Sequence, residues 1–224
     1  MSDKLILKVL TIANRKGGAG KSTCAANLAL EATSRGLKTI LIDLDPQHTL
    51  ENWWKKREAE EPYLADANAS NLKEKLEQLR QKGFDLCIID TPGDTSANTY
   101  IGIEVADLVV IPTKATAPDL SAIGRTLGMV KETYKKPFVF VVTQTIARSS
   151  TALKAASILS SFGPVAPITI ANRIAYSNAM GEGISVGDAG DKLAAKEIEE
   201  VWNFIAPRIV EHKLGVSHGI KEKV

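Results

Sequence analysis

The stretch Lys16-Gly17-Gly18-Ala19-Gly20-Lys21-Ser22-Thr23 separates an apolar run from a helical one. The run before it, VLTIA at 9–13, is short and rich in β-branched residues, which is typical of a buried strand. After it, apolar side chains recur at helical spacing, at Ala25, Leu28, Ala29 and Ala32, and Gly36 is a typical helix stop. Glycines between a strand and a helix N-terminus let backbone N–H groups converge on a dense anion. We therefore interpret the stretch as a phosphate-binding loop rather than an ordinary glycine-rich turn with a helix cap.

The same alternation of strand and helix continues along the chain. Further strands are predicted at Thr39–Ile42, Phe84–Ile89, Leu108–Ile111, Phe138–Val142 and Val165–Ile170. Helices are predicted at 47–60, 72–83, 119–134 and 152–159, and a last one carries the stripe Ile198, Val201, Trp202, Ile205 and Ile209. The strands are apolar without alternation, so both of their faces must be covered. We expect a single α/β domain over 1–224, a three-layer doubly wound P-loop NTPase with a mainly parallel β-sheet, and a flexible tail at 212–224.

Composition excludes several classes of protein. The formal net charge is only +2, so any nucleic-acid surface must be a local patch. We expect the two cysteines, Cys24 and Cys87, to be reduced, buried thiols of a cytoplasmic protein. The first residues lack a signal-peptide pattern, and no apolar run reaches the roughly 18 residues of a membrane span.

Charged side chains follow the first three of the strands named above. They are Lys21, the pair Asp43 and Asp45, and Asp90. The carboxyl ends of parallel strands meet at one edge of a sheet, where ligands bind. On this pattern Lys21 would reach the β- and γ-phosphates of a nucleotide, the Ser22 hydroxyl would bind Mg²⁺, and Asp90 would hold Mg²⁺ directly or through water.

The loop departs from the plain phosphate-loop pattern, because Arg15 stands at the first glycine position and Lys16 is a second lysine. This form, K-G-G-x-G-K-[ST], is the deviant Walker A loop, and the chain here resembles the ParA/MinD family of ATPases. The resemblance is strongest at 16–23, 43–47 and 84–92 and extends more loosely through Ile111-Pro112 and Asp119 to about 183–188.

The resemblance implies an ATPase that uses ATP and Mg²⁺, binds nucleotide through residues 16–23, and sandwiches ATP in a homodimer. In that family the signature lysine, which Lys16 matches, reaches the partner's phosphates and acts with Lys21 in catalysis. Asp45 matches the residue that orients the attacking water, and Asp43 matches a magnesium-shell aspartate. A helix cap is the alternative role for Asp43. The family also implies slow hydrolysis that works as a timer.

Signals for the base of the nucleotide are weaker. Thr143 and Gln144 follow a strand and could meet adenine, and so could the segment from Pro167 to Arg173. The proline-containing segment 112–118 resembles one that lies near the nucleotide and the dimer contact in small ParA proteins. An ordinary loop at the end of a strand explains the segment 112–118 nearly as well. Trp53 and Trp54 are expected to pack as a pair with one exposed edge.

The first functional hypothesis is a ParA-type partition ATPase. Its ATP-bound dimer would coat non-specific DNA on the nucleoid, and a ParB-like or other centromere or cargo adaptor would stimulate hydrolysis, so that plasmid, chromosome or other cargo is positioned. No extension precedes the first strand, so we expect no helix-turn-helix domain, and DNA contacts would be phosphate contacts. The candidate residues are Arg148, Lys154, Arg173, Lys192, Lys196 and Arg208. From Arg148 onward nine Lys and Arg face eight Asp and Glu, so charge alone is no DNA signal.

Rival functions stay open. A MinD-like membrane-cycling ATPase needs a C-terminal amphipathic helix, and the tail 211–224 is a poor one because Gly215 and Gly219 break it. An iron–sulfur reductase of the same superfamily needs later cysteines, and none follows Cys87. A biosynthetic enzyme or kinase would show an acceptor cluster, which is not conspicuous. A conjugative-transfer relative of ParA is a near neighbour of the first hypothesis.

Overall fold

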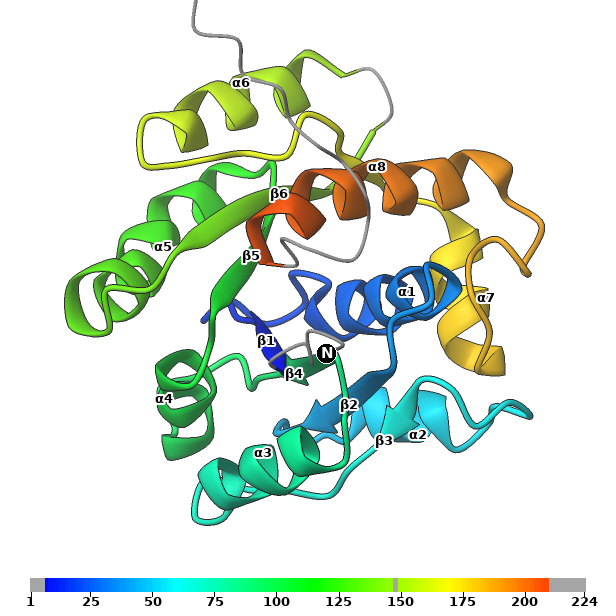
Figure 1. Cartoon of the computed structure of the whole chain (residues 1–224). Coiled ribbons are helices and arrows are strands. Elements are labelled where there is room, and N and C mark those ends of the chain that lie inside the picture. Colours follow the sequence, from blue (N-terminus) through cyan, green and yellow to red (C-terminus); the bar gives the residue numbers. More distant parts are fainter. Residues whose placement is uncertain (1–6, 147–148, 210–224) are drawn as a thin grey trace, which may run out of the picture.

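A parallel β-sheet forms the centre of the computed structural model, which describes residues 7–146 and 149–209 (Figure 1). Within those residues the sheet has seven strands in the order β3-β2-β4-β1-β5-β6-β7, and every neighbouring pair is parallel. Their bounds are β1 Lys8–Ile12, β2 Thr39–Asp43, β3 Tyr63–Leu64, β4 Leu86–Asp90, β5 Leu108–Lys114, β6 Phe138–Thr145 and β7 Ile170–Ala171. The predicted fold class is therefore confirmed.

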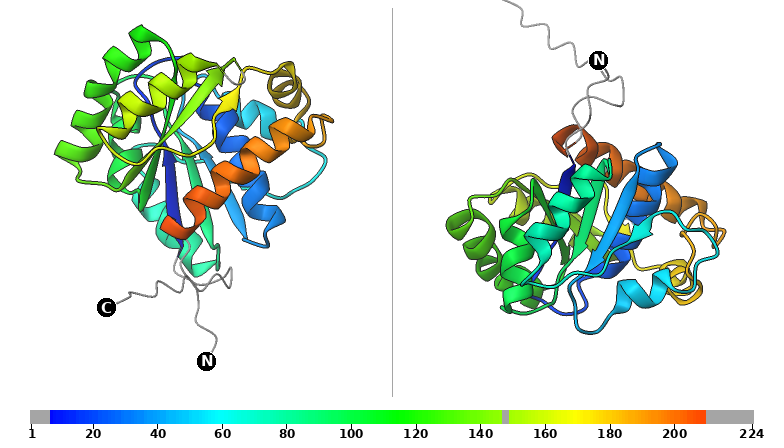
Figure 2. Two further views of the ribbon diagram at one scale, coloured as in Figure 1. Left: turned by 90° about the horizontal axis from the view of Figure 1, so that it is seen from above. Right: turned by 60° about the horizontal axis from the view of Figure 1, so that its bottom comes forward.

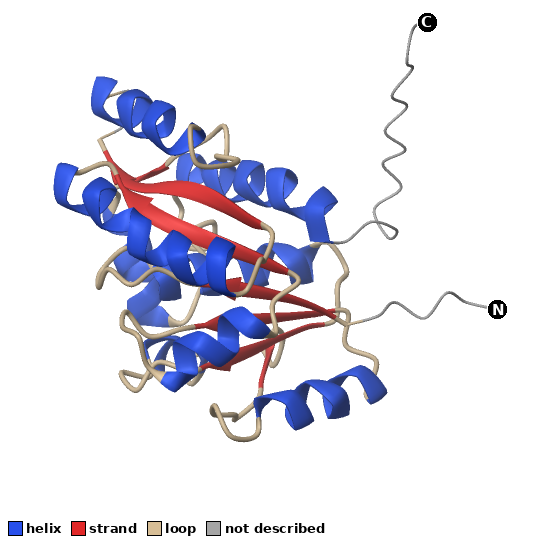
Figure 3. Ribbon diagram, turned by 90° about the vertical axis from the view of Figure 1, so that its left-hand side faces the viewer, coloured by secondary structure: helices blue, strands red, loops and turns tan. Residues whose placement is uncertain are grey.

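Helices cover both faces of this sheet (Figure 3). One face packs against α1 (Lys21–Ser34), α2 (Thr49–Trp54), α7 (Ile174–Glu182) and α8 (Lys192–Ile209). The other packs against α3 (Leu72–Gln81), α4 (Ala97–Glu104), α5 (Ala117–Leu127) with the π-helix η1 (Gly128–Thr133), and α6 (Ser150–Ser160). The C-terminal helix α8 lies over α1, and Trp202 on it is 1% exposed (Figure 2). The stripe read from the sequence does dock on the core.

The strand order changes direction around β1, which lies between β4 and β5. A change of direction opens a crevice at the carboxyl ends of the strands, and the loop after β1 leads into it. Asp43 at the end of β2 is paired in register with Asp90 at the end of β4, and Ile12 at the end of β1 is paired with that same Asp90. The predicted convergence of polar groups at one edge is confirmed.

Several sequence-based boundaries were wrong. The helix predicted at 47–60 is only α2, because the chain then turns so that Arg57 donates to the carbonyls of Gly183 and Glu61. The strand predicted at Val165–Ile170 is limited to β7 and one isolated bridge between Phe140 and Val165. Prolines at 164 and 167 lack the N–H that a ladder needs. The short elements β3, α4 and α7 went unpredicted.

Two further expectations concern side chains and the tail. Cys24 and Cys87 are both buried and free, as expected. Trp53 is 1% exposed and its indole donates to Ile184 O, while Trp54 is half-buried and donates to Pro62 O, which confirms the packing pair. The tail at 212–224 lies outside the described residues. Among the residues the structure does describe, no helix is both long and apolar enough to cross a membrane.

Candidate active site

The loop after β1 wraps around a hollow at the N-terminus of α1. Gly20 is the N-cap of this helix and has a φ of 90°, a left-handed conformation that glycine adopts without a steric penalty. Lys21 follows at the first helical position and is only 7% exposed. A nearly buried ammonium at a helix N-terminus concentrates positive potential in one spot. The geometry matches the predicted phosphate-binding loop.

The loop after β4 closes over this site. A Cβ added at Gly93 would lie 3.3 Å from the backbone nitrogen of Gly17 and 3.3 Å from the Lys21 ammonium. Glycine is thus the residue that lets this loop approach so closely. Thr91 anchors the approach from below, because its hydroxyl donates to Ile12 O at 2.9 Å. The loops after β1 and β4 are thus joined although Ile12 and Thr91 are 79 residues apart in sequence.

Asn14 fixes the start of the phosphate loop. It is 4% exposed, its Nδ2 donates to Pro112 O at 2.7 Å, and its Oδ1 accepts from the Lys16 backbone N–H at 3.0 Å. Sequence reasoning missed this residue. The signal that could have found it is a polar residue directly after an apolar strand and directly before the loop. Asn14 ties the loop to the segment 112–118, which therefore lies beside the site.

Two residues at the end of β6 hold the other half of the loop. The Thr143 hydroxyl donates to Ala19 O at 2.9 Å, and Gln144 Nε2 donates to Gly18 O at 2.7 Å. Both were predicted as adenine contacts. The structure gives them a structural task on the loop in addition to a place in the wall of a neighbouring cavity.

Asp90 is the most unusual group of the site. It is 0% exposed, and neither carboxylate oxygen accepts a hydrogen bond of standard geometry from a described residue, although the Ser22 hydroxyl lies close enough to lower its pKa. Burial raises the pKa of Asp90 to about 7, and the nearby Asp43 raises it as well, while Ser22 and Lys21 oppose the shift. A buried carboxylate left without partners is costly unless a cation completes it. Asp90 and the neighbouring Ser22 hydroxyl form the oxygen donor set that suits Mg²⁺.

Asp43 is already engaged within the chain. Its Oδ1 accepts from the Asp45 N–H at 3.0 Å, and its Oδ2 accepts from the Glu51 N–H in the first turn of α2, also at 3.0 Å. Burial raises its pKa, and these two N–H groups oppose the rise. The contacts are those of the alternative role, a helix cap. The magnesium-shell role of Asp43 stays a prediction.

Asp45 is half-buried and reaches the phosphate side of the site. Its Oδ1 accepts from the Gln47 N–H at 3.0 Å, which holds the loop after β2 in place. Its Oδ2 accepts no hydrogen bond from the described residues. One fixed and one available oxygen is the arrangement that a water-orienting carboxylate needs, so the geometry is compatible with the predicted role.

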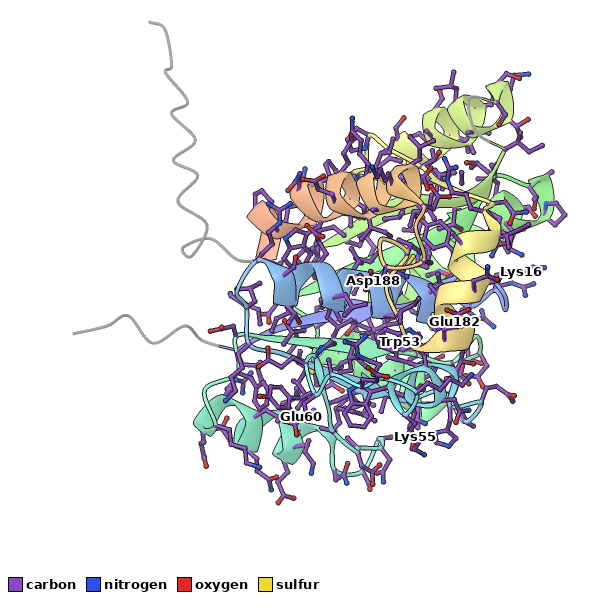
Figure 4. The ribbon with its side chains drawn as sticks, turned by 90° about the vertical axis from the view of Figure 1, so that its right-hand side faces the viewer. Lys16, Trp53, Lys55, Glu60, Glu182 and Asp188 are labelled. Carbon is purple, nitrogen blue, oxygen red and sulfur yellow. The ribbon has the colours of Figure 1, made fainter. Side chains whose placement is uncertain are left out.

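The lysines around the loop differ in exposure. Lys16 is exposed at the periphery of the molecule, and its side chain has no hydrogen-bond or ion-pair partner among the described residues (Figure 4). Lys114, at the end of β5, was not predicted as a site residue. Its ammonium lies 3.6 Å from where a Cβ on Gly18 would sit. Together with Lys21, these residues place three ammonium groups on or beside one short loop.

Two adjoining cavities lie along this edge of the sheet. The first has a volume of ≈ 580 Å³ and is lined by the phosphate loop, by Asp45, and by 92–94. The second has a volume of ≈ 350 Å³ and lies at the ends of β6 and β7. They share Gly20, Thr23, Thr49 and Gln144 as lining residues. A ligand with a polyanionic end and a planar end would span both.

The second cavity, called the base-side cavity below, is lined by residues 170–173 and by α7. Asn172 has a side chain with no hydrogen-bond partner among the described residues, whereas Arg173 is bound to Glu197 at 2.8 Å and lies 3.6 Å from Asp191. Arg173, predicted to contact the nucleotide, does line this cavity. Pro167, predicted with it, is exposed and is not among the lining residues. Asn172 was not singled out by the sequence.

The residues predicted to contact DNA are scattered and differ in their engagement. Lys154 and Lys192 are exposed, without an ion-pair partner among the described residues. Lys196 lies 3.7 Å from Glu200, and Arg208 stacks on Phe204 at 3.8 Å from the ring centroid. The guanidinium of Arg173 is committed to Glu197 and Asp191, which makes it a poor phosphate ligand for DNA. Arg148 lies outside the described residues.

Comparison with known proteins agrees with this geometry. The family model of the CobQ/CobB/MinD/ParA nucleotide binding domain matches residues 10–186. The "Maintenance of carboxysome distribution protein A" of Halothiobacillus neapolitanus is 32% identical over 214 residues, which cover 88% of this chain and 96% of that protein. The "Protein ParA" of Rhizobium radiobacter is 32% identical over 128 residues, 56% of this chain and 57% of that protein.

Solved structures show the same fold. An ATP complex of a McdA variant from Cyanothece has a TM-score of 0.76 at 21% identity and covers 90% of this chain and 97% of its own. The MinC:MinD cell division complex from Aquifex aeolicus has a TM-score of 0.75 at 15% identity and covers 94% of this chain and 98% of its own. The likeness extends over nearly the whole chain in both cases.

Proposed function

This chain belongs to the CobQ/CobB/MinD/ParA family of nucleotide-binding domains, and on that premise we propose that it is an ATP-gated dimer that positions a large cargo on DNA. As a positioning ATPase of the ParA/MinD type it uses ATP and Mg²⁺. The phosphates lie in the cavity around residues 16–23, and the base lies in the base-side cavity. Asp90 and the Ser22 hydroxyl would hold Mg²⁺, which would neutralise charge on the phosphates.

The contrast between Lys16 and Lys21 carries this proposal. Lys21 is 7% exposed and faces the cavity of its own chain, while Lys16 is exposed and unpartnered within the described residues. A second cation without an acceptor among the described residues of its own subunit is available to the phosphates of another. Supplied in trans, it would stabilise the charge that develops during phosphoryl transfer, as an arginine finger does. Hydrolysis then requires the dimer, so ATP acts as a switch for assembly.

Asp45 orients the attacking water in this scheme. Asp45 lines the phosphate cavity, and its Oδ1 fixes the loop at Gln47. Lys21 and the backbone N–H groups of the loop bind the phosphates, and Gly93 lets the loop after β4 lie directly against Gly17 and Lys21. This division of labour uses one general base and several fixed positive groups, which suits slow, partner-controlled hydrolysis.

DNA and an adaptor complete the proposed cycle. A relative named for carboxysome distribution and another named ParA support a positioning function, and we propose DNA as the surface on which the cargo is positioned. Lys154 on α6 and Lys192 on α8 are the first candidates for DNA phosphate contacts because they are exposed and unpaired among the described residues. Association with the nucleoid in the ATP state follows from such contacts. An adaptor protein bound to the cargo stimulates hydrolysis and releases the dimer.

Replacement of Lys16 tests the dimer. We expect Lys16→Ala to bind ATP but to stay monomeric in light scattering, and to hydrolyse ATP about 1,000-fold more slowly, the lower range for a cation supplied in trans. Lys131→Ala removes an equally exposed lysine on η1 and serves as the matched control. An ATP-dependent dimer of Lys16→Ala with unchanged hydrolysis would refute the proposal.

Binding assays with DNA and with membranes identify the surface on which the protein would position its cargo. Non-specific duplex DNA and anionic vesicles are each titrated with ATP and with ADP across a range of salt. We expect ATP-dependent DNA binding in which the logarithm of the binding constant falls linearly with the logarithm of the salt concentration. Vesicle binding without DNA binding would instead support a membrane-cycling function of the MinD type.

A further inference from the structure

Glu197 on α8 is the most heavily hydrogen-bonded carboxylate near the base-side cavity. It is 8% exposed and does not line the cavity itself. Its Oε1 accepts from Arg173 Nε at 3.1 Å and from the second guanidinium nitrogen at 2.8 Å. Its Oε2 accepts from the Ala171 backbone N–H at 3.1 Å and from the Tyr176 hydroxyl at 3.0 Å. One buried side chain therefore holds β7, α7 and the turn between them.

The three groups that Glu197 holds are all parts of the cavity wall. Ala171, Arg173 and Tyr176 each line the base-side cavity. Burial raises the pKa of the Tyr176 hydroxyl, and the Glu197 carboxylate raises it as well, so this group stays a neutral donor. Four hydrogen bonds converge on one carboxylate from behind the wall, and charge-assisted bonds of this kind are the stronger class.

Asn172 stands between two of the anchored residues. Its backbone N–H donates to Thr145 O at 2.8 Å, its side-chain amide is unpartnered among the described residues, and the residue lines the cavity. A free carboxamide on a pinned backbone offers one donor and one acceptor to a planar base. Polar groups discriminate between ligands only when their positions are held to within about 0.5 Å. The anchoring of residues 171 and 173 supplies that constraint.

We propose that Glu197 is a positioning residue that sets base selectivity: by fixing Ala171, Arg173 and Tyr176, it holds the wall that distinguishes adenine from guanine. This inference rests on the proposed nucleotide function and adds a determinant outside the phosphate loop. Glu197 acts on the base alone, because its partners line the base-side cavity and do not line the phosphate cavity. Binding energy from the phosphates is therefore independent of it.

Three probes separate the two halves of the ligand: ATP, GTP and inorganic tripolyphosphate, each measured by competition in the full chain with Mg²⁺. In Glu197→Gln the neutral amide loses the charge-assisted bonds to Arg173. We expect ATP affinity to fall about 10-fold and the preference for ATP over GTP to shrink by about the same factor. Tripolyphosphate affinity and kcat at saturating ATP should stay within about 2-fold of wild type, since no phosphate contact changes.

Two further variants serve as controls. Glu200→Gln alters a half-exposed carboxylate on the same helix that does not line the base-side cavity, and it should match wild type with all three probes. Arg173→Lys keeps the charge and loses the two-pronged contact, so it should reproduce the loss of preference, and it decides the matter if Glu197→Gln does not fold.

Each remaining outcome has a defined meaning. Unchanged ATP preference in both variants would overturn the inference, and so would an equal loss for all three probes, which would indicate a general structural role. If the wild type bound ATP and GTP equally, the inference about Glu197 would be wrong, but the proposed nucleotide function would stand. A wild type that binds none of the three would overturn the proposed function and the inference with it.

Discussion

The phosphate loop and the wall of the base-side cavity, which includes Ala171, Arg173 and Tyr176, lie at the same edge of the sheet. They differ in whether their charged side chains have partners. Around the loop, Asp90 is buried without a hydrogen-bond partner among the described residues, and Lys16 is exposed without an ion-pair partner there. Behind the wall, Arg173 and Glu197 satisfy one another at 2.8 Å. A carboxylate that is buried without a partner, as Asp90 is, favours a ligand that completes its interactions, whereas the paired Arg173 and Glu197 hold neighbouring segments together. We therefore infer that the first region binds the nucleotide and that the second fixes the wall of the base-side cavity.

The largest expected effect comes from removing the buried cation of the first region. Lys21→Ala should lower kcat/KM for ATP about 1,000-fold, because Lys21 is the nearly buried ammonium at the loop, while Lys16 is exposed and Lys114 is half-exposed. Steady-state hydrolysis measures the effect, and Lys131→Ala is the control. Retention of most activity would mean that the two regions do not differ as described.

An intermediate effect is expected from the second region. Asn172→Ala should weaken ATP about 10-fold by removing hydrogen bonds to the base, and should leave tripolyphosphate binding unchanged. Competition binding measures both ligands. Asn203→Ala, at an exposed position on α8, provides the comparison. Equal weakening of ATP and tripolyphosphate would erase the distinction between the two cavities.

The smallest effect is expected from Lys114, which lies beside the loop. Lys114→Ala should weaken ATP about 3-fold at low salt, and this difference should shrink near 0.5 M salt, roughly, because a half-exposed charge is screened. Binding isotherms at the two salt concentrations test it. A salt-independent loss would show instead that Lys114 supports the loop by packing.

The two regions also differ in how much of each could be predicted from the sequence. The loop is contiguous, and its glycines, lysines and flanking strand and helix are adjacent in sequence, so fold class and residues 16–23 could be inferred directly. Asp90 could be inferred because it ends an apolar strand. Asn14 and Lys114 were missed because their roles depend on contacts with Pro112 and Gly18, about a hundred residues away in each case.

The wall of the base-side cavity could not be predicted from the sequence in this way. Arg173 was assigned to nucleotide and to DNA, and the sequence has no sign that Glu197 on α8 would neutralise it. Pro167 was assigned with Arg173 because they are neighbours in sequence, yet the chain turns Pro167 outward. Asp43 shows the same ambiguity, since a strand-end aspartate fits a metal site and a helix cap equally well until Glu51 N–H is seen bound to it.

The hydrogen bonds that shape the phosphate loop also constrain the order in which the molecule can fold. The loop itself spans eight residues, but its anchors join Asn14 to Pro112, Ala19 to Thr143 and Gly18 to Gln144, over sequence separations of 98, 124 and 126. The contacts of Glu197 with Arg173 and Tyr176 span only 24 and 21. Long-range contacts in a parallel sheet form slowly, because the intervening chain must first be ordered. The most local motif in the sequence is thus completed only after β5 and β6 have docked, and recovery of nucleotide binding during refolding would report the arrival of the whole sheet.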